Sequence, residues 1–122
     1  RYVREAEGQR VRQAVAALTP QTPGVTLGTS PLSQRPAMEQ NAANKALFAL
    51  AAEAGHELGQ EFAEEYRGGV SDANLLAAQG VPVLDGLGPV GDRDHSPEEY
   101  MIVSSLAPRV ALTALLIRKA LT

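Results

Sequence analysis

The apolar residues of the last predicted helix, residues 106–121, constrain the fold more than any other feature of this sequence. Helical spacing places four apolar residues on one face: Val110, Ala114, Ile117 and Leu121. Three leucines widen this apolar surface: Leu112, Leu115 and Leu116. A helix with so broad an apolar surface is typically buried on more than one side. We therefore expect it to pack against a sheet larger than these 122 residues could build.

Three other segments show helical patterns. Residues 5–18 form an amphipathic pattern that ends at Thr19-Pro20, and residues 46–58 carry an apolar stripe that ends at Gly59. A shorter helix is predicted over residues 71–79, with Ser71 or Asp72 as its N-cap and Gly80 just past its end.

Four short segments predict β-strands, so the expected fold class is α/β. They are residues 2–4, 25–28, 61–67 and 81–84, the last being apolar on both faces, as in a strand covered by helices. The first 30 residues would leave a sheet edge exposed, so we expect them to pack against something outside this chain or to pair with a second copy. Turn-forming residues at positions 29–36 predict a hinge after this piece.

Composition excludes several classes of function. A net charge of -3 gives no basic surface for a nucleic acid, and no cysteine is present to form a disulfide scaffold or a thiolate metal site. No apolar run approaches the roughly 20 residues of a membrane span, and the first residues are no signal peptide, so we expect no membrane partner and a cytoplasmic location. A chain of this length could bury roughly two-thirds of its unfolded surface.

His95 is the candidate metal ligand. It follows a Gly-rich loop and is flanked by acidic residues in Gly91-Asp92-Arg93-Asp94-His95-Ser96-Pro97-Glu98-Glu99-Tyr100, which suits a metal-bound imidazole as well as an ordinary loop histidine. The only other histidine, His56, is expected to be a solvated helix-end residue. No spacing of His, Asp or Glu completes a coordination sphere, so His95 would be one part of a site whose other ligands lie elsewhere. Ser96 and Glu99 fit a capping box that would start a helix.

Three other features could bind an anion or a ligand. The loop at residues 68–74 offers backbone N–H groups at a helix N-terminus, although an ordinary capped turn would have the same sequence. The glycines of residues 85–91 would allow close backbone approach to a ligand or make an irregular turn. Arg35, at the hinge, is either a clamp for a substrate carboxylate or a surface charge.

Taken in order, four segments resemble the di-zinc metallopeptidases that include carboxypeptidase G, aminoacylase and succinyl-diaminopimelate desuccinylase. The segments are Arg35-Pro36-Ala37-Met38, Gly68-Gly69-Val70-Ser71-Asp72-Ala73-Asn74, Gly80-Val81-Pro82-Val83-Leu84-Asp85-Gly86-Leu87-Gly88-Pro89-Val90-Gly91 and His95-Ser96-Pro97-Glu98-Glu99-Tyr100. The likeness spans nearly the whole chain.

The resemblance implies a domain organisation. In that family a catalytic α/β domain is interrupted by a smaller α+β lid domain that usually mediates dimerisation. Residues 1–30 would be the second half of the lid/dimerisation domain, and residues 31–122 would be the C-terminal segment of the zinc-exopeptidase catalytic domain. A homodimer formed through the lid is therefore expected.

The resemblance also implies a metallopeptidase activity for the parent protein. His95 would be the last ligand of two zinc ions, with cobalt or manganese as alternatives, that are bridged by an aspartate and a water. The other ligands and the glutamate general base would lie upstream of Arg1, so this chain would hold no catalytic base and, without the rest of the parent chain, no activity. The reaction would be hydrolysis of a C-terminal residue or an N-acyl amino acid, with a small peptide or N-acyl amino acid as substrate. The alternatives are a non-catalytic dimerisation or interaction module and a family member without metal.

Five residues are expected to bind substrate by the same resemblance: Arg35, Arg67, Gly69, Ser71 and Asn74. Arg35 would bind a substrate carboxylate, and the loop at residues 68–74 would hold the substrate backbone. Two departures bear on this expectation. Arg67 stands one position later than the arginine of glutamate-directed relatives, and Val70 replaces their third glycine. Residues 92–94, with two acidic side chains and an arginine, stand where many relatives have small residues.

Overall fold

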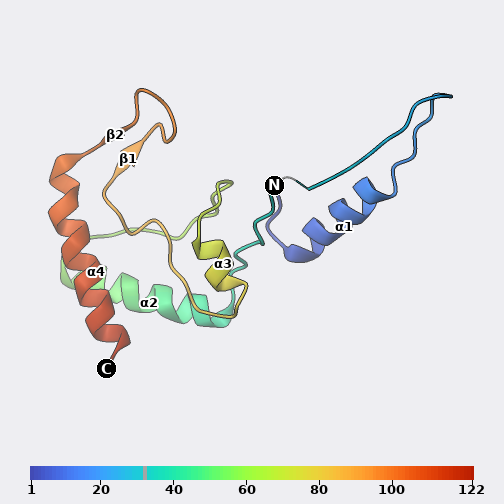
Figure 1. The fold of residues 1–122 in the computed structure, drawn as a ribbon. Helices are drawn as coiled ribbons and strands as arrows, with labels where there is room; N and C mark the ends of the chain where they lie inside the picture. Colours follow the sequence, from blue (N-terminus) through green and yellow to red (C-terminus); the bar gives the residue numbers. More distant parts are fainter. Residues whose placement is uncertain (32) are drawn as a thin grey trace. The chain divides into compact units, whose positions relative to one another are not determined.

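A computed structural model describes residues 1–31 and 33–122, which form two compact units (Figure 1). Unit 1 comprises residues 1–40 and 66–81, and unit 2 comprises residues 41–65 and 82–122. Leu32, within the predicted hinge, lies outside the described residues, and the rest of the hinge forms no helix or strand. The predicted domain boundary between residues 30 and 31 remains a prediction.

Unit 1 contains two helices, α1 (Glu5–Ala16) and α3 (Ala73–Ala77). Two glutamates in the first turn of α1 favour its start, because negative charge interacts well with the positive end of the helix dipole. The hydroxyl oxygen of Ser71 accepts a hydrogen bond from the N–H of Ala73 at 3.1 Å at the start of α3. Gly80, at φ +80°, turns the chain after α3 as predicted.

Unit 2 is built on α2 (Ala42–Glu57) and α4 (Leu106–Ala120), which pack against each other. The buried apolar residues between them are Ala51, Ala54, Leu112 and Leu116. Helix α2 begins four residues before the predicted start, because the side chain of Asn41 caps it by accepting the N–H of Asn44 at 2.9 Å. It ends at the predicted place, where Gly59 adopts φ +66°.

Lysine and glutamate side chains join the exposed ends of these two helices. The Lys119 ammonium lies 2.6 Å from a carboxylate oxygen of Glu53 and 2.6 Å from one of Glu57. Both carboxylates stand on α2 and the lysine on α4. The lysine therefore links the two helices through both carboxylates.

Phe62 packs on α2 and α4 by its ring. Its ring lies edge-on to that of Phe48 at 6.2 Å, and the Arg109 guanidinium stands 5.6 Å from its centroid. Gly55 makes room for it, since a Cβ at Gly55 would approach a ring atom to 2.6 Å. Phe62 therefore anchors its segment on the two helices, although the segment is not a strand.

The strands of unit 2 are two short ones, β1 (Gly91–Asp92) and β2 (Tyr100–Met101), which pair antiparallel and are followed by the 3-10 turn η1 (Val103–Ser105). Gly91 permits this pairing, because a Cβ there would collide with the carbonyl oxygen of Tyr100. Ser105 holds the base of the hairpin: its hydroxyl oxygen accepts the N–H of Val90 at 2.8 Å and it donates to the carbonyl of Ile102 at 2.6 Å.

The predictions of strands at residues 2–4, 25–28, 61–67 and 81–84 were wrong for this structure, whose described residues form no sheet beyond β1 and β2. A strand is stable only when a neighbour takes up its backbone hydrogen bonds, and no described segment does so here. The N–H of Val83 instead donates to the side chain of buried Asn44 at 3.2 Å. The fold is mixed, with helices and a small two-stranded sheet, and is compatible with part of an α/β domain.

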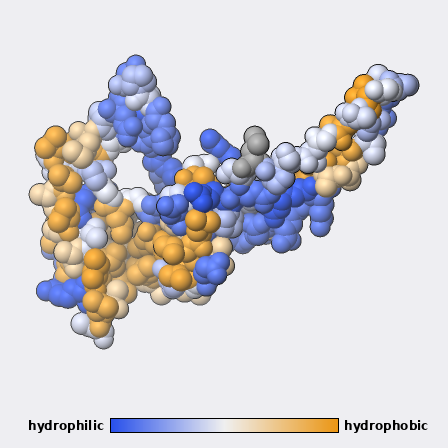
Figure 2. All heavy atoms as spheres, viewed as in Figure 1, coloured by the Kyte–Doolittle hydropathy of each residue, from blue (hydrophilic) through white to orange (hydrophobic). Residues whose placement is uncertain are grey.

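Folding buries less surface than the chain length would allow. An unfolded chain of 12.9 kDa exposes about 18,700 Å². The folded chain exposes 9441 Å², so about half is buried instead of the expected two-thirds. Apolar side chains gather at the surface over α2 and α4 (Figure 2), and on α4 the exposed ones include Leu106, Val110 and Ile117. The second buried face predicted for this helix is therefore not covered by any described residue.

No helix of the described chain has the length and apolar character to cross a membrane.

Candidate functional site

His95 lies in the loop of the β1–β2 hairpin in unit 2. The loop comprises residues 93–99, and its side chains are exposed except for half-buried Ser96. Below it the backbone pairing of the strands continues with a hydrogen bond from the N–H of Ile102 to the carbonyl of Val90 at 2.8 Å. The sequence therefore presents the imidazole at the end of a short hairpin, outside the core of unit 2.

Local hydrogen bonds shape this loop. The N–H of His95 donates to Glu99 Oε2 at 3.3 Å, and the hydroxyl oxygen of Ser96 accepts the N–H of Glu98 at 3.2 Å. His95 at φ +66° and Arg93 at φ +63° occupy the left-handed region, which histidine enters more readily than most residues with a Cβ. The predicted capping box forms only in part, because Glu99 accepts the N–H of His95 instead of that of Ser96. The segment is a turn and does not start a helix.

The residues around His95 fit a single metal ligand and do not form a complete metal site. An exposed imidazole on a shaped turn can coordinate a metal ion. Within residues 1–31 and 33–122, however, no group of three or more His, Asp and Glu side chains lies close enough to hold one. Asp92, one of the nearby acidic residues, accepts the N–H of the next residue, Arg93, at 2.7 Å. A coordination sphere would need ligands from outside these residues.

Arg35 and the loop before α3 lie together in unit 1. Arg35 Nη2 stands 3.3 Å from Asp72 Oδ1. Asn74 Nδ2 donates to the carbonyl of Pro36 at 2.8 Å, and Asn74 Oδ1 accepts the N–H of Ser71 at 3.0 Å. Two of the segments that carry the family resemblance are therefore in direct contact, although 38 positions separate Pro36 from Asn74.

The two remaining predicted residues, Arg67 and Gly69, lie in the same unit and are exposed. A Cβ at Gly69 would meet no atom within 4 Å, whereas one at the neighbouring Gly68 would approach the guanidinium of Arg1 to 2.8 Å. Crowding by described residues requires a glycine at neither position, because the Arg1 guanidinium is the end of a flexible side chain that can move aside. The structure groups Arg35 with Ser71 and Asn74 in unit 1, while His95 belongs to unit 2.

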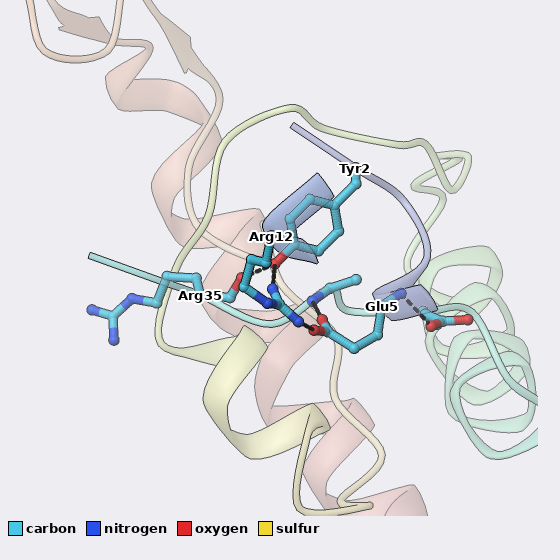
Figure 3. A network of polar contacts seen from close by, with 6 residues as sticks. Tyr2, Glu5, Arg12 and Arg35 are labelled. Atoms are coloured by element: carbon cyan, nitrogen blue, oxygen red, sulfur yellow. Dashed lines mark hydrogen bonds and ion pairs between the residues drawn. The ribbon is translucent and has the colours of Figure 1, made fainter. Parts of the chain in front are cut away.

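A network of three side chains holds the base of the Arg35 segment (Figure 3). The Tyr2 hydroxyl donates to the carbonyl of Arg35 at 3.1 Å, and Glu5 Oε2 accepts the N–H of Ala37 at 3.1 Å. Arg12 Nη2 lies 2.6 Å from Glu5 Oε1, and Arg12 Nη1 donates to the Tyr2 oxygen at 3.3 Å. The hydrogen bond from Arg12, followed by that from Ala37, holds the pKa of Glu5 below its ordinary value of 4.5.

Nothing in the sequence pattern singles out these network residues. A glutamate in the first turn of a helix reads as a partner of the helix dipole, and Glu7 has the same signature as Glu5. Only the folded chain distinguishes them, because Glu7 pairs with Arg10 on the helix surface while Glu5 reaches Ala37.

Comparison with known proteins identifies the family. The model of peptidase family M20/M25/M40 matches residues 9–119, which include the hinge arginine, the loop before α3 and the His95 hairpin. Neither a curated protein nor a solved structure matches the chain significantly. Peptidases of this family are hydrolases and generally use metal ions. The matched segment covers most of the chain, and we conclude that this chain belongs to peptidase family M20/M25/M40.

Proposed function

We propose that this chain is the C-terminal portion of a zinc-dependent metallopeptidase or amidohydrolase that hydrolyses a C-terminal residue or an N-acyl amino acid. The observation that carries the proposal is the His95 imidazole, exposed at the end of a hairpin within a segment that matches a peptidase family. By itself the chain would be inactive, since His95 would be its one zinc ligand and the general base would come from the rest of the parent chain.

His95 would be one ligand of a pair of zinc ions. Bound zinc supplies an activated water and polarises the scissile carbonyl. The hairpin residues would position the metal ligand. The left-handed backbone at His95 and the hydrogen bond from its N–H to Glu99 fix the place from which the imidazole projects. The remaining ligands would come from the rest of the parent chain.

Arg35 would bind the substrate carboxylate. A guanidinium offers a planar pair of N–H donors that matches a carboxylate, and a carboxylate, that of Asp72, already lies against it. The loop that holds Arg67, Gly69, Ser71 and Asn74 would form the wall beside the substrate, and the bond from Asn74 to Pro36 supports this by joining the loop to the Arg35 segment.

The test of the metal role is the variant His95→Ala in the full-length protein. Mutation of a residue that only supports a metal ligand lowers activity by roughly 10–100-fold, and loss of the ligand itself should lower kcat by more. Zinc content should also fall, while the circular dichroism spectrum stays unchanged. His56→Ala is the matched control, because His56 is exposed near the end of α2 and is not part of the hairpin. Normal zinc content and near-normal turnover in His95→Ala would refute the proposal.

A second candidate function is self-association, with the chain serving as a dimerisation or interaction module. The exposed apolar side chains of α4 favour it, since soluble proteins seldom leave such a stripe in contact with water. Light scattering over a range of protein concentrations tests this candidate. A mass that stays at 12.9 kDa at the highest concentration would speak against it.

A further inference from the structure

We propose that Tyr2 and Glu5 are positioning residues for Arg35: they fix the backbone at residues 35–37 so that the guanidinium is presented to a substrate carboxylate. The inference rests on the proposed role of Arg35 and adds two residues from a part of the chain that the resemblance assigns no role in substrate binding.

Three consecutive backbone groups carry the argument. The carbonyl of Arg35 accepts a hydrogen bond from Tyr2, the carbonyl of Pro36 accepts one from Asn74, and the N–H of Ala37 donates to Glu5. Proline has no N–H and a fixed φ, so the segment has few remaining degrees of freedom. Side chains from two distant parts of unit 1, the start of α1 and the start of α3, thus hold the main chain from which Arg35 projects.

The network is directional. Arginine can only donate hydrogen bonds, so the Tyr2 oxygen accepts from Arg12 and its single proton is left for the carbonyl of Arg35. The Tyr2 ring packs against helix α1 at buried Gly8, where a Cβ would approach ring atoms to 2.5–2.9 Å. With its pKa lowered, Glu5 stays ionised at neutral pH and remains an acceptor for both Arg12 and Ala37.

The bonds end on the main chain and leave the guanidinium available. Figure 3 shows the Arg35 side chain pointing away from the network, and it is 40% exposed. Its partner Asp72 is 87% exposed, and an ion pair this open to water holds together weakly. A fixed backbone with an accessible guanidinium is a preorganised receptor, because less conformational entropy is lost when a carboxylate binds.

The experiment measures KM and kcat of the full-length enzyme with a substrate that has a C-terminal carboxylate and with its C-terminal amide. Glu5→Ala and Tyr2→Phe should raise KM for the carboxylate substrate about 5- to 10-fold, leave kcat nearly unchanged and leave the amide substrate unaffected. Glu5→Gln, which keeps an acceptor for Ala37, should restore part of the loss. Glu7→Ala is the matched control, since it removes a carboxylate from the same helical turn without touching residues 35–37.

Arg35→Ala separates failure of the inference from failure of the proposed function. If Arg35→Ala leaves KM for the carboxylate substrate unchanged, Arg35 has no such role and the positioning role is lost with it. If Arg35→Ala raises KM but Glu5→Ala and Tyr2→Phe do not, or if they affect both substrates equally, the positioning inference alone is overturned. If Arg35 binds the carboxylate and Glu5 positions Arg35, Glu5→Ala should cause no further rise in KM for the carboxylate substrate once Arg35→Ala is present.

Discussion

At the scale of single residues, the left-handed backbone of the hairpin loop sets what can stand at position 95. His95 and Arg93 are the described residues other than glycine that have a positive φ, and both lie within the turn that carries the candidate ligand. Histidine and asparagine tolerate this region, whereas a β-branched side chain collides with its own backbone there. The backbone of the turn therefore limits which residue types fit at position 95, whether or not an imidazole is needed there.

Substitutions at position 95 should separate backbone tolerance from chemistry. His95→Asn should leave the free energy of unfolding within about 0.5 kcal/mol of the original, whereas His95→Val should lower it by about 1–2 kcal/mol. Urea denaturation followed by circular dichroism measures the difference. Equal stability of the two variants would show that the loop relaxes freely out of the left-handed conformation.

His95 and Arg35 could be selected from sequence because each stands in a recognisable local run. The residues that hold Arg35 could not, because the bonds from Tyr2 to Arg35 and from Glu5 to Ala37 join positions 33 and 32 apart in the chain. Contacts of that range depend on tertiary structure, and no local pattern encodes them.

At the scale of elements, helices α2 and α4 depend on one another. Leu112 has 0% exposure and lies on the face of α4 that packs against α2, while Val110, two positions away, is 61% exposed. The two side chains show that one helix presents a buried face and an open apolar face.

Truncation of these two side chains should have unequal effects. Leu112→Ala should lower the free energy of unfolding by about 2–5 kcal/mol, because it removes buried methyl groups and leaves a cavity. Val110→Ala on the same helix should change it by less than about 0.5 kcal/mol. Thermal and urea unfolding curves provide the comparison, and similar losses for both variants would mean that the open face of α4 is covered in solution.

The bridge between α2 and α4 should make the stability of unit 2 sensitive to acid. The hydrogen bond from Lys119 lowers the pKa of Glu57 below its ordinary value of 4.5. The stabilisation is therefore fully present above pH 4.5 and is lost as the pH falls through the lower pKa of the folded state. Glu57→Gln should lower the melting temperature at neutral pH, and its difference from the original chain should shrink on acidification; a difference independent of pH would contradict this cause.

The helices were predictable and the strands were not, for a physical reason. Helices α1, α2 and α4 close their hydrogen bonds within one segment, so an apolar stripe and end signals such as Gly59 suffice to locate them. A strand at residues 81–84 depends on a neighbouring strand, which no described segment supplies. Helix α2 starts before its apolar stripe, because Asn41 caps it and Ala42 and Ala43 form its first turn.

At the scale of the whole molecule, burial is distributed unevenly between the two units. Among the described residues of unit 1, Gly8 alone is buried. The buried residues of unit 2 are Asn44, Ala51, Ala54, Gly55, Leu112 and Leu116. Unit 1 relies mainly on hydrogen bonds and ion pairs, and these contribute little where water competes.

Hydrogen exchange should reveal this difference directly. Amides in the middle of α2 and α4 should exchange at least about 10-fold more slowly than those of α1, because opening them requires exposure of the apolar core. Mass spectrometry of peptic fragments after timed exchange measures both units in one sample. Equal protection of α1 would mean that unit 1 has a core comparable to that of unit 2.

The bridge formed by Lys119 also affects covalent labelling of the chain. The sequence contains two lysines, and Lys45 is exposed while Lys119 is 19% exposed between two carboxylates. Hydrogen bonds to Glu53 and then Glu57 raise the pKa of Lys119, so its amine stays protonated and is a poor nucleophile toward acylating reagents. Of the two lysines, a fluorescent ester applied near neutral pH would thus attach at Lys45 and spare Lys119, which places a probe on α2 without mutation.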